Sequence, residues 1–136
     1  MVIPFIRILL VDDFEPWRRQ VCSILADRPE LRVVAETSDG LEAVQKAEEV
    51  KPDLILLDIG LPSLDGVEAA KRIQVVAPGT KVIFLTQNSD KAIVEAALST
   101  GARGYVLKAG AARELLSAVA AVLSGDQFLS SGVKRE

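Results

Sequence analysis

Apolar runs of strand length alternate with segments of helical spacing along the chain. Apolar residues fill five short stretches whose length is that of buried strands, residues 5–11, 31–35, 54–57, 81–85 and 104–107. Between and after these stretches, apolar positions recur every three or four residues, which predicts helices over residues 15–27, 40–50, 64–76, 90–100 and 111–124. The pattern therefore predicts five consecutive strand–helix units.

Strands that are apolar throughout, each followed by a helix, are typical of a parallel sheet that is buried on both faces. Right-handed crossover connections limit how such a sheet can be wound. We therefore expect an α/β fold with a doubly wound, five-stranded parallel sheet and helices on both faces. A chain of 136 residues with 49% apolar content can bury one sizeable core, so one domain is expected.

The composition excludes several kinds of site. A formal net charge of −3 and the lack of any run of Lys or Arg argue against nucleic-acid binding by this segment. Cys22 is the only cysteine and the chain has no histidine, which excludes an internal disulfide and argues against zinc sites and Ser/His or Cys/His catalysis. Residues 1–11 lack a basic leader, and no stretch reaches the roughly 18 apolar residues of a membrane span, so we expect a cytoplasmic protein without membrane contact.

Polar residues follow four of the five predicted strands. Asp12 and Asp13 follow the first, Asp58 the third, Thr86 the fourth and Lys108 the fifth. In open α/β sheets the ligand site lies beyond the carboxyl ends of the strands, so these side chains are expected to converge. The second strand ends in Glu36 and Thr37, which add nothing obvious to such a site, as expected of an edge strand.

Charge balance indicates what this site binds. Carboxylates 4 Å apart repel by about 4 kcal/mol per pair at an effective dielectric of 20, so three of them need positive charge nearby. Lys108 supplies one charge, and a hard divalent cation such as Mg²⁺, which prefers oxygen ligands, supplies the rest. A carboxylate can attack phosphorus to form an acyl phosphate, while Thr86 and Lys108 could bind the phosphoryl oxygens. Each residue also has an ordinary interpretation, such as helix capping by Asp12 and Asp13, but their joint position favours a site.

The motifs resemble those of response-regulator receiver domains over residues 5–125. They are Asp12-Asp13, Asp58 in LILLDIGLPSLDG, Thr86 in VIFLTQN and Lys108 in GARGYVLKAG. The resemblance implies a flavodoxin-like strand order of 2-1-3-4-5. It also implies a receiver domain over residues 1–125, with residues 126–136 forming a C-terminal tail or the start of a linker to an effector domain.

The resemblance also implies a role for each site residue. Asp58 would be the phosphoacceptor and a metal ligand, Asp13 a direct ligand of Mg²⁺ and Asp12 a ligand through water. The backbone carbonyl of Gly60 would be a further metal ligand. Thr86 and Lys108 would hold the phosphoryl group. Tyr105 would be the aromatic residue that turns inward with Thr86 on activation.

The end of the sequence indicates how the domain is used. The stretch GYVLKAGAARELLSAVAAVLSGDQFLSSGV is similar to regulators that carry a LuxR-type helix-turn-helix effector. The resemblance implies a regulatory domain and not an enzyme, with at most self-phosphorylation from acyl phosphates and autodephosphorylation as its own reactions. It also implies a sensor histidine kinase as the phosphoryl donor and a DNA-binding effector outside this sequence. Ser117 is the only polar residue between positions 115 and 123, which predicts a contact surface, for a homodimer or an effector, on the fifth helix.

Alternatives and departures from the family pattern remain open at this point. The alternatives are a stand-alone receiver, a phosphorelay module, a Mg²⁺-dependent phosphohydrolase, a flavin-binding electron carrier, a purely structural interaction module and a receiver that signals without phosphorylation. Ala109 stands where many receivers have proline, so a trans bond is expected after Lys108. Gln87 and Asn88 follow Thr86 where many members have a small residue, which leaves the lifetime of the phosphorylated state open.

Overall fold

Strands and helices alternate along residues 4–133, the part of the chain that the computed structural model describes. The strands are β1 (Ile6–Val11), β2 (Leu31–Thr37), β3 (Leu54–Leu57), β4 (Lys81–Thr86), β5 (Gly104–Leu107) and β6 (Phe128–Leu129). The helices are α1 (Glu15–Leu25), α2 (Gly40–Val50), α3 (Gly66–Val76), α4 (Lys91–Leu98) and α5 (Ala111–Leu123), with a short 3-10 turn, η1 (Lys108–Gly110). The five predicted strand–helix units are all present.

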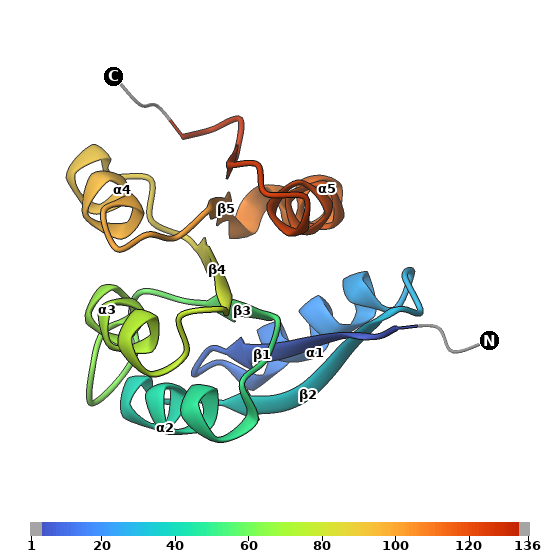
Figure 1. The fold of residues 1–136 in the computed structure, drawn as a ribbon. Coiled ribbons are helices and arrows are strands. Elements are labelled where there is room, and N and C mark those ends of the chain that lie inside the picture. Colours follow the sequence, from blue (N-terminus) through green and yellow to red (C-terminus); the bar gives the residue numbers. More distant parts are fainter. Residues whose placement is uncertain (1–3, 134–136) are drawn as a thin grey trace.

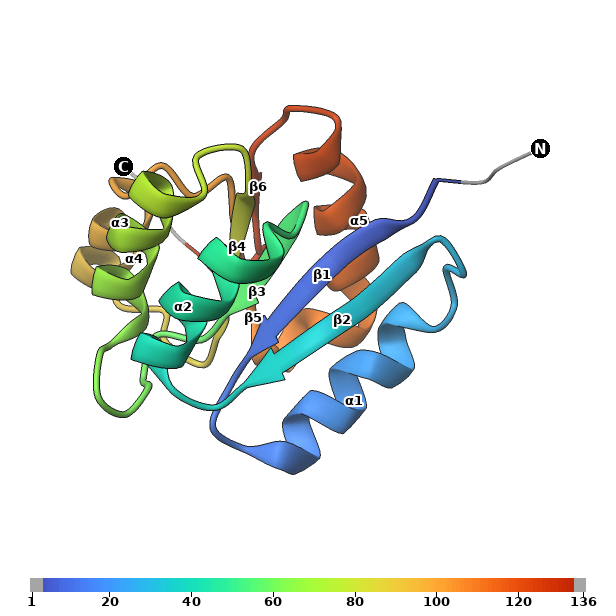
Figure 2. The same ribbon diagram turned by 60° about the horizontal axis from the view of Figure 1, so that its bottom comes forward.

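The strands form one parallel sheet in the order β2-β1-β3-β4-β5-β6. Helices α1 and α5 cover one face, and α2, α3 and α4 cover the other (Figures 1 and 2). The α/β class and the parallel sheet are as predicted. None of the helices within residues 4–133 combines the length and apolar character that crossing a bilayer requires.

The predicted count of five strands is wrong, because β6 adds a sixth strand at the edge next to β5. Gly104 pairs with Phe128 and Tyr105 with Leu129. The Oγ of buried Ser130 accepts a hydrogen bond from Leu107 N–H at 2.9 Å. A strand of two residues is too short to show the alternation from which strands are predicted. The predicted tail, residues 126–136, is described only as far as residue 133.

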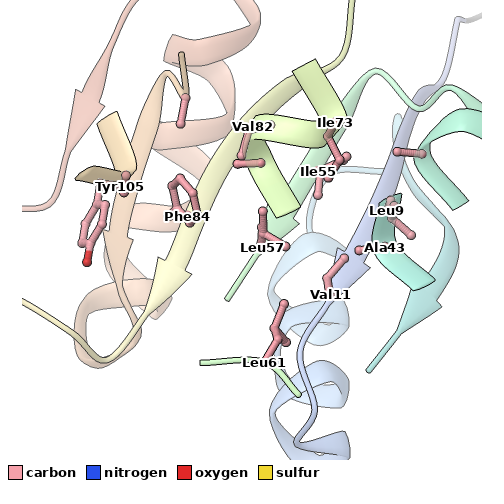
Figure 3. Packing of buried hydrophobic residues seen from close by; sticks show 14 of the residues in the cluster. Leu9, Val11, Ala43, Ile55, Leu57, Leu61, Ile73, Val82, Phe84 and Tyr105 are labelled. Carbon is pink, nitrogen blue, oxygen red and sulfur yellow. The ribbon is translucent and has the colours of Figure 1, made fainter. Parts of the chain in front are cut away.

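Both faces of the sheet bury apolar side chains. β3 is buried along its whole length, with Ile55 and Leu57 on the α2–α4 side and Leu54 and Leu56 on the α1–α5 side. Figure 3 shows the cluster on the α2–α4 side, where the side chains of Leu57 and Phe84 lie in a row that ends at Tyr105. Because each fully buried aliphatic or aromatic side chain contributes about 1.5–3 kcal/mol, these clusters hold the strand ends in fixed relative positions.

Aspartates fix where three of the helices begin. The carboxylates of Asp39, Asp65 and Asp90 accept hydrogen bonds from N–H groups in the first turns of α2, α3 and α4. A residue that caps in this way lies outside the helix, with extended backbone. Helices α3 and α4 therefore begin later than residues 64 and 90, where the periodicity predicts them to begin.

A one-residue bulge interrupts β2. Ile8 pairs with Val33, but Leu9 pairs with Ala35, so Val34 is an extra residue in this strand. An extra residue reverses which side chains face each side of the sheet from that point on. Glu36, which pairs with Leu10, therefore lies on the face that α1 covers.

Candidate functional site

The predicted site residues meet in a cleft at the carboxyl ends of β1, β3, β4 and β5. The cavity measures about 830 Å³, and six of the seven predicted residues line it, namely Asp12, Asp13, Asp58, Gly60, Thr86 and Lys108. Tyr105 is not among the lining residues and is fully buried beside the cleft. The convergence follows from the topology, because parallel strands present their carboxyl ends at one edge of the sheet.

Three carboxylates form an acidic cluster in this cleft. One carboxylate oxygen from each of Asp12, Asp13 and Asp58 lies within 4.8 Å of the other two. Asp12 is 2% exposed and Asp58 8%, whereas Asp13 is exposed to solvent. Backbone donors orient the two buried groups, with Phe14 N–H donating to Asp12 Oδ1 at 2.9 Å and Ile59 N–H to Asp58 Oδ1 at 2.8 Å.

Lys108 lies between the two buried carboxylates. Its Nζ is 2.7 Å from Asp12 Oδ2 and 3.5 Å from Asp58 Oδ2. Asp12 Oδ2 is buried and, among the described residues, has this ion pair but no hydrogen bond of good geometry. With all four groups ionised, three carboxylates and one ammonium leave two negative charges. This charge and the free oxygen lone pairs fit a divalent cation with oxygen ligands.

The surroundings of Lys108 are also defined. The ammonium lies 5.4 Å from the centre of the Trp17 ring, so the single tryptophan is close to the cleft. Lys108 opens the turn η1, and no peptide bond within residues 4–133 is cis. The predicted trans bond between Lys108 and Ala109 is confirmed.

The carboxyl of Asp58 has an altered proton affinity. Burial raises the pKa of Asp58 above its ordinary value, and the charge of Asp12 raises it further. The ammonium of Lys108, the N–H of Ile59 and the hydroxyl of Thr86 act in the opposite direction, because they stabilise the carboxylate. Asp58 is therefore more easily protonated than an exposed aspartate.

Tyr105 contacts the loop that follows β4. Its hydroxyl donates to the backbone carbonyl of Asn88 at 2.5 Å, and Asn88 N–H donates to Thr86 Oγ1 at 3.3 Å. Burial raises the pKa of Tyr105 to about 12, with the charges of Asp58 and Asp90 adding to the effect. Asn88 thus links the aromatic residue to the hydroxyl in the cleft, with Tyr105 in its inward orientation.

The glycine that holds the loop carrying Asp58 was not among the residues predicted from the sequence. Gly66 N–H donates to Ile59 O at 2.7 Å, and a Cβ at Gly66 would lie 2.0 Å from the carbonyl oxygen of Asp58. Only glycine allows α3 to begin so close to the backbone of Asp58. The Asp-Gly pair at residues 65–66 is a signal that could have indicated this close approach.

Arg18 and Glu36, beside the acidic turn, were also not among the site residues predicted from the sequence. Arg18 Nη1 donates to the backbone carbonyl of Asp12 at 2.7 Å, and Arg18 Nε donates to Glu36 Oε1 at 2.9 Å. The end of β2 therefore does contact the site region, contrary to the expectation for an edge strand. The sequence carries no signal for this pair, because the bulge in β2 decides which way Glu36 faces.

Comparisons with known proteins agree with this geometry. The family model described as "Response regulator receiver domain" matches residues 8–120. Transcriptional regulatory protein LnrK from Bacillus subtilis (strain 168) is 41% identical over 124 residues, which are 91% of this chain and 56% of LnrK. The chain spans between 52% and 61% of the curated relatives it matches.

Solved structures give the same result. A LuxR-family two-component response regulator from Aurantimonas sp. SI85-9A1 superposes with a TM-score of 0.90 at 32% identity, covering 95% of this chain and 92% of that one. The receiver of RcsB from Salmonella enterica serovar Typhimurium, with the phosphomimetic BeF3−, gives 0.88 at 26% identity, covering 95% and 96%. RcsB dimers bound to DNA give 0.87 at 26% identity, covering 95% of this chain and 66% of that one. This chain belongs to the family of response-regulator receiver domains.

Proposed function

We propose that this chain is a phosphorylation-controlled switch, in which Asp58 accepts a phosphoryl group from a sensor histidine kinase and the change is relayed to a DNA-binding effector. One observation carries the proposal. In an open cleft, the Lys108 ammonium lies between the buried carboxylates of Asp12 and Asp58, with Asp13 close by. Family membership makes the domain regulatory and not a phosphohydrolase or a flavin carrier.

The chain's own groups can divide the work of phosphoryl transfer. Asp12, Asp13, Asp58 and the carbonyl of Gly60 would hold Mg²⁺, which would neutralise charge on the phosphoryl oxygens. An Asp58 carboxylate oxygen would form the bond to phosphorus as the bond to the donor's leaving group breaks. The sequence has no histidine, so a phosphohistidine donor must lie outside these 136 residues.

Phosphorylation changes the charge that Lys108 and Thr86 face. The phosphoryl group carries about −1.5 to −2 charges and three acceptor oxygens where Asp58 had one charge. Lys108, already 3.5 Å from Asp58 Oδ2, would pair with it, and the Thr86 hydroxyl would donate to it. Through Asn88, which contacts both Thr86 and Tyr105, this change would reach α4 and β5. Gln87 and Asn88 line the cleft and would set how long the phosphoryl group persists.

Family membership and the relatives also support proposals about partners. LnrK is named a transcriptional regulatory protein, and RcsB dimers bind DNA, so we assign this chain a DNA-binding effector beyond residues 126–136 and a cytoplasmic location. A homodimer through α5 is also proposed. An apolar groove of about 330 Å³ lies there, with Ile6, Leu31, Leu116, Val119 and Leu123 in its lining.

Acetyl phosphate with Mg²⁺ tests the proposed phosphoacceptor directly. Intact mass measurement should show one added phosphoryl group on the wild type and on Asp27→Asn, because Asp27 is an exposed aspartate in the turn that follows α1. Asp58→Asn should show none. Modification of Asp58→Asn to the wild-type level, or a wild type that stays unmodified, would overturn the assignment.

A further inference from the structure

The guanidinium of Arg18 joins the end of the edge strand to the acidic turn. Arg18 lies on α1, and its side chain is only 17% exposed. Its Nε donates to Glu36 Oε1 at 2.9 Å while its Nη1 donates to Asp12 O at 2.7 Å. Hydrogen bonds from a charged guanidinium are among the strongest in proteins, and its planar fork fixes the direction of both partners.

The bulge in β2 makes this arrangement possible. Up to Val33 the strand alternates in register with β1, and the extra Val34 reverses the alternation. Glu36 therefore faces α1, where Arg18 can reach it. Without the extra residue Glu36 would face α2, on the other side of the sheet.

Both backbone polar groups of Asp12 are thereby held, and its carbonyl belongs to the peptide that leads into Asp13. Asp12 N–H donates to Thr37 O at 3.1 Å, and Asp12 O accepts from Arg18. The side chain of Asp12 is held separately by Phe14 N–H and Lys108. Asp13 has an exposed side chain, so the orientation of this peptide decides where its carboxylate lies.

We propose that Arg18, oriented by Glu36, is a positioning residue for the divalent cation. It fixes the Asp12–Asp13 peptide so that the Asp13 carboxylate meets the other two acidic groups. This inference rests on the proposed function, because it takes the acidic cluster as the cation site. Arg18 acts through the backbone and touches neither the cation nor the phosphoryl group.

The sign of the effect separates positioning from simple electrostatics. Removing a positive charge near an anionic site strengthens cation binding if Coulomb interaction is the only effect. Loss of positioning weakens it, and loss of an outer-shell partner costs typically about 10–100-fold in metal affinity. We therefore expect Arg18→Gln to bind Mg²⁺ about tenfold more weakly.

The experiment compares Mg²⁺ affinity by isothermal titration calorimetry. Arg19→Gln is the matched control. Arg19 is the next residue and its side chain is 78% exposed, and this substitution removes the same charge as Arg18→Gln. Its affinity should equal or slightly exceed that of the wild type. Arg18→Lys keeps the charge but cannot hold both partners, so it should fall between Arg18→Gln and the wild type.

Glu36→Gln tests whether Glu36 acts through Arg18. It should weaken Mg²⁺ binding in the wild-type background and have little effect in Arg18→Gln, because coupled residues are not additive. Thermal unfolding with a chelator present measures metal-free stability and verifies that each variant is folded. If Arg18→Gln does not fold, Arg18→Lys and Glu36→Gln still provide the comparison.

The outcomes distinguish this inference from the function on which it rests. A wild type that binds no Mg²⁺ overturns both. A wild type that binds Mg²⁺ beside an Arg18→Gln variant of equal or higher affinity overturns only the positioning role. Equal weakening in Arg18→Gln and Arg19→Gln also overturns it, because the effect would not depend on contact with Asp12.

Discussion

Lys108→Met should destabilise the metal-free protein and strengthen its binding of Mg²⁺. The change keeps an unbranched apolar stem and removes the ammonium 2.7 Å from Asp12 Oδ2 and 3.5 Å from Asp58 Oδ2. The side chains of Lys108, Asp12 and Asp58 are 13%, 2% and 11% exposed. Two buried carboxylates then face each other without the cation that separates them.

The size of the effect follows from the burial of these groups. Removing one partner of a buried ion pair costs about 3–5 kcal/mol, and the partial exposure of Lys108 favours the lower end. A domain of ordinary stability, about 5–15 kcal/mol, remains folded after such a loss. The ammonium also competes with a bound cation, at about 4 kcal/mol per unit-charge pair 4 Å apart and an effective dielectric of 20. Its removal should raise Mg²⁺ affinity about tenfold or more.

Urea unfolding with a chelator and with saturating Mg²⁺ measures both effects. In chelator, the free energy of unfolding of Lys108→Met should be about 3 kcal/mol lower than that of the wild type. Saturating Mg²⁺ should raise the free energy of unfolding more in Lys108→Met than in the wild type. Lys71→Met is the control, because its side chain is 57% exposed and lies 3.9 Å from Glu68, so about 0.5 kcal/mol or less is expected. Equal stability of Lys108→Met and the wild type in chelator, with equal gains from Mg²⁺, would refute the charge-balance argument.

Three further predictions concern single groups. Burial raises the pKa of Asp58 above the ordinary value of about 3.9, so between the pKa of the unfolded chain and that of the folded protein only the folded state keeps the carboxyl proton. The free energy of unfolding should therefore fall as pH rises through this range. Asp58→Asn should be more stable than the wild type at neutral pH, and its stability in urea titrations should lack this pH dependence. If the stabilities of the variant and the wild type changed in parallel with pH, the raised pKa of Asp58 would be contradicted. Gly66→Ala should cost about 1–3 kcal/mol in chemical unfolding, since its Cβ would lie 2.0 Å from Asp58 O, whereas Gly79→Ala, with nothing within 4 Å, should cost less. Tyr105 is the only tyrosine, and burial raises its pKa to about 12. Ultraviolet titration of the folded protein should therefore show no phenolate near pH 10, where the tyrosine of the unfolded chain should ionise. Ionisation of the folded protein near pH 10 would show that the phenol is not buried.

The strand ends were the most predictable part of the site. Asp58, Thr86 and Lys108 each follow a run of apolar residues, and the rule that parallel strands end at one edge brings them together. The roles of phosphoacceptor, metal ligand and switch residue stay predictions, to be decided by the experiments above. The contact of Tyr105 with Asn88 O had no sequence signal, because it depends on the path of the loop after β4.

Short elements were the least predictable part of the fold. The pair Phe128–Leu129 forms β6 only because the edge of β5 is free to accept it. The bulge at Val34 is likewise decided by pairing, since residues 31–35 read as an uninterrupted run of strand residues. Both are long-range events that no local pattern encodes.

The sequence by itself determined the alternation of strands and helices, the parallel sheet and the acidic strand ends, because periodicity and the chemistry of each residue are local properties. Tertiary structure alone decided which side chains outside the motifs support the site. Arg18 meets Asp12 and Glu36 only once β2 is paired out of register with β1, and Gly66 is required only once α3 packs against the backbone of Asp58. Such contacts depend on the relative placement of distant segments, which hydrophobic burial fixes in the folded chain.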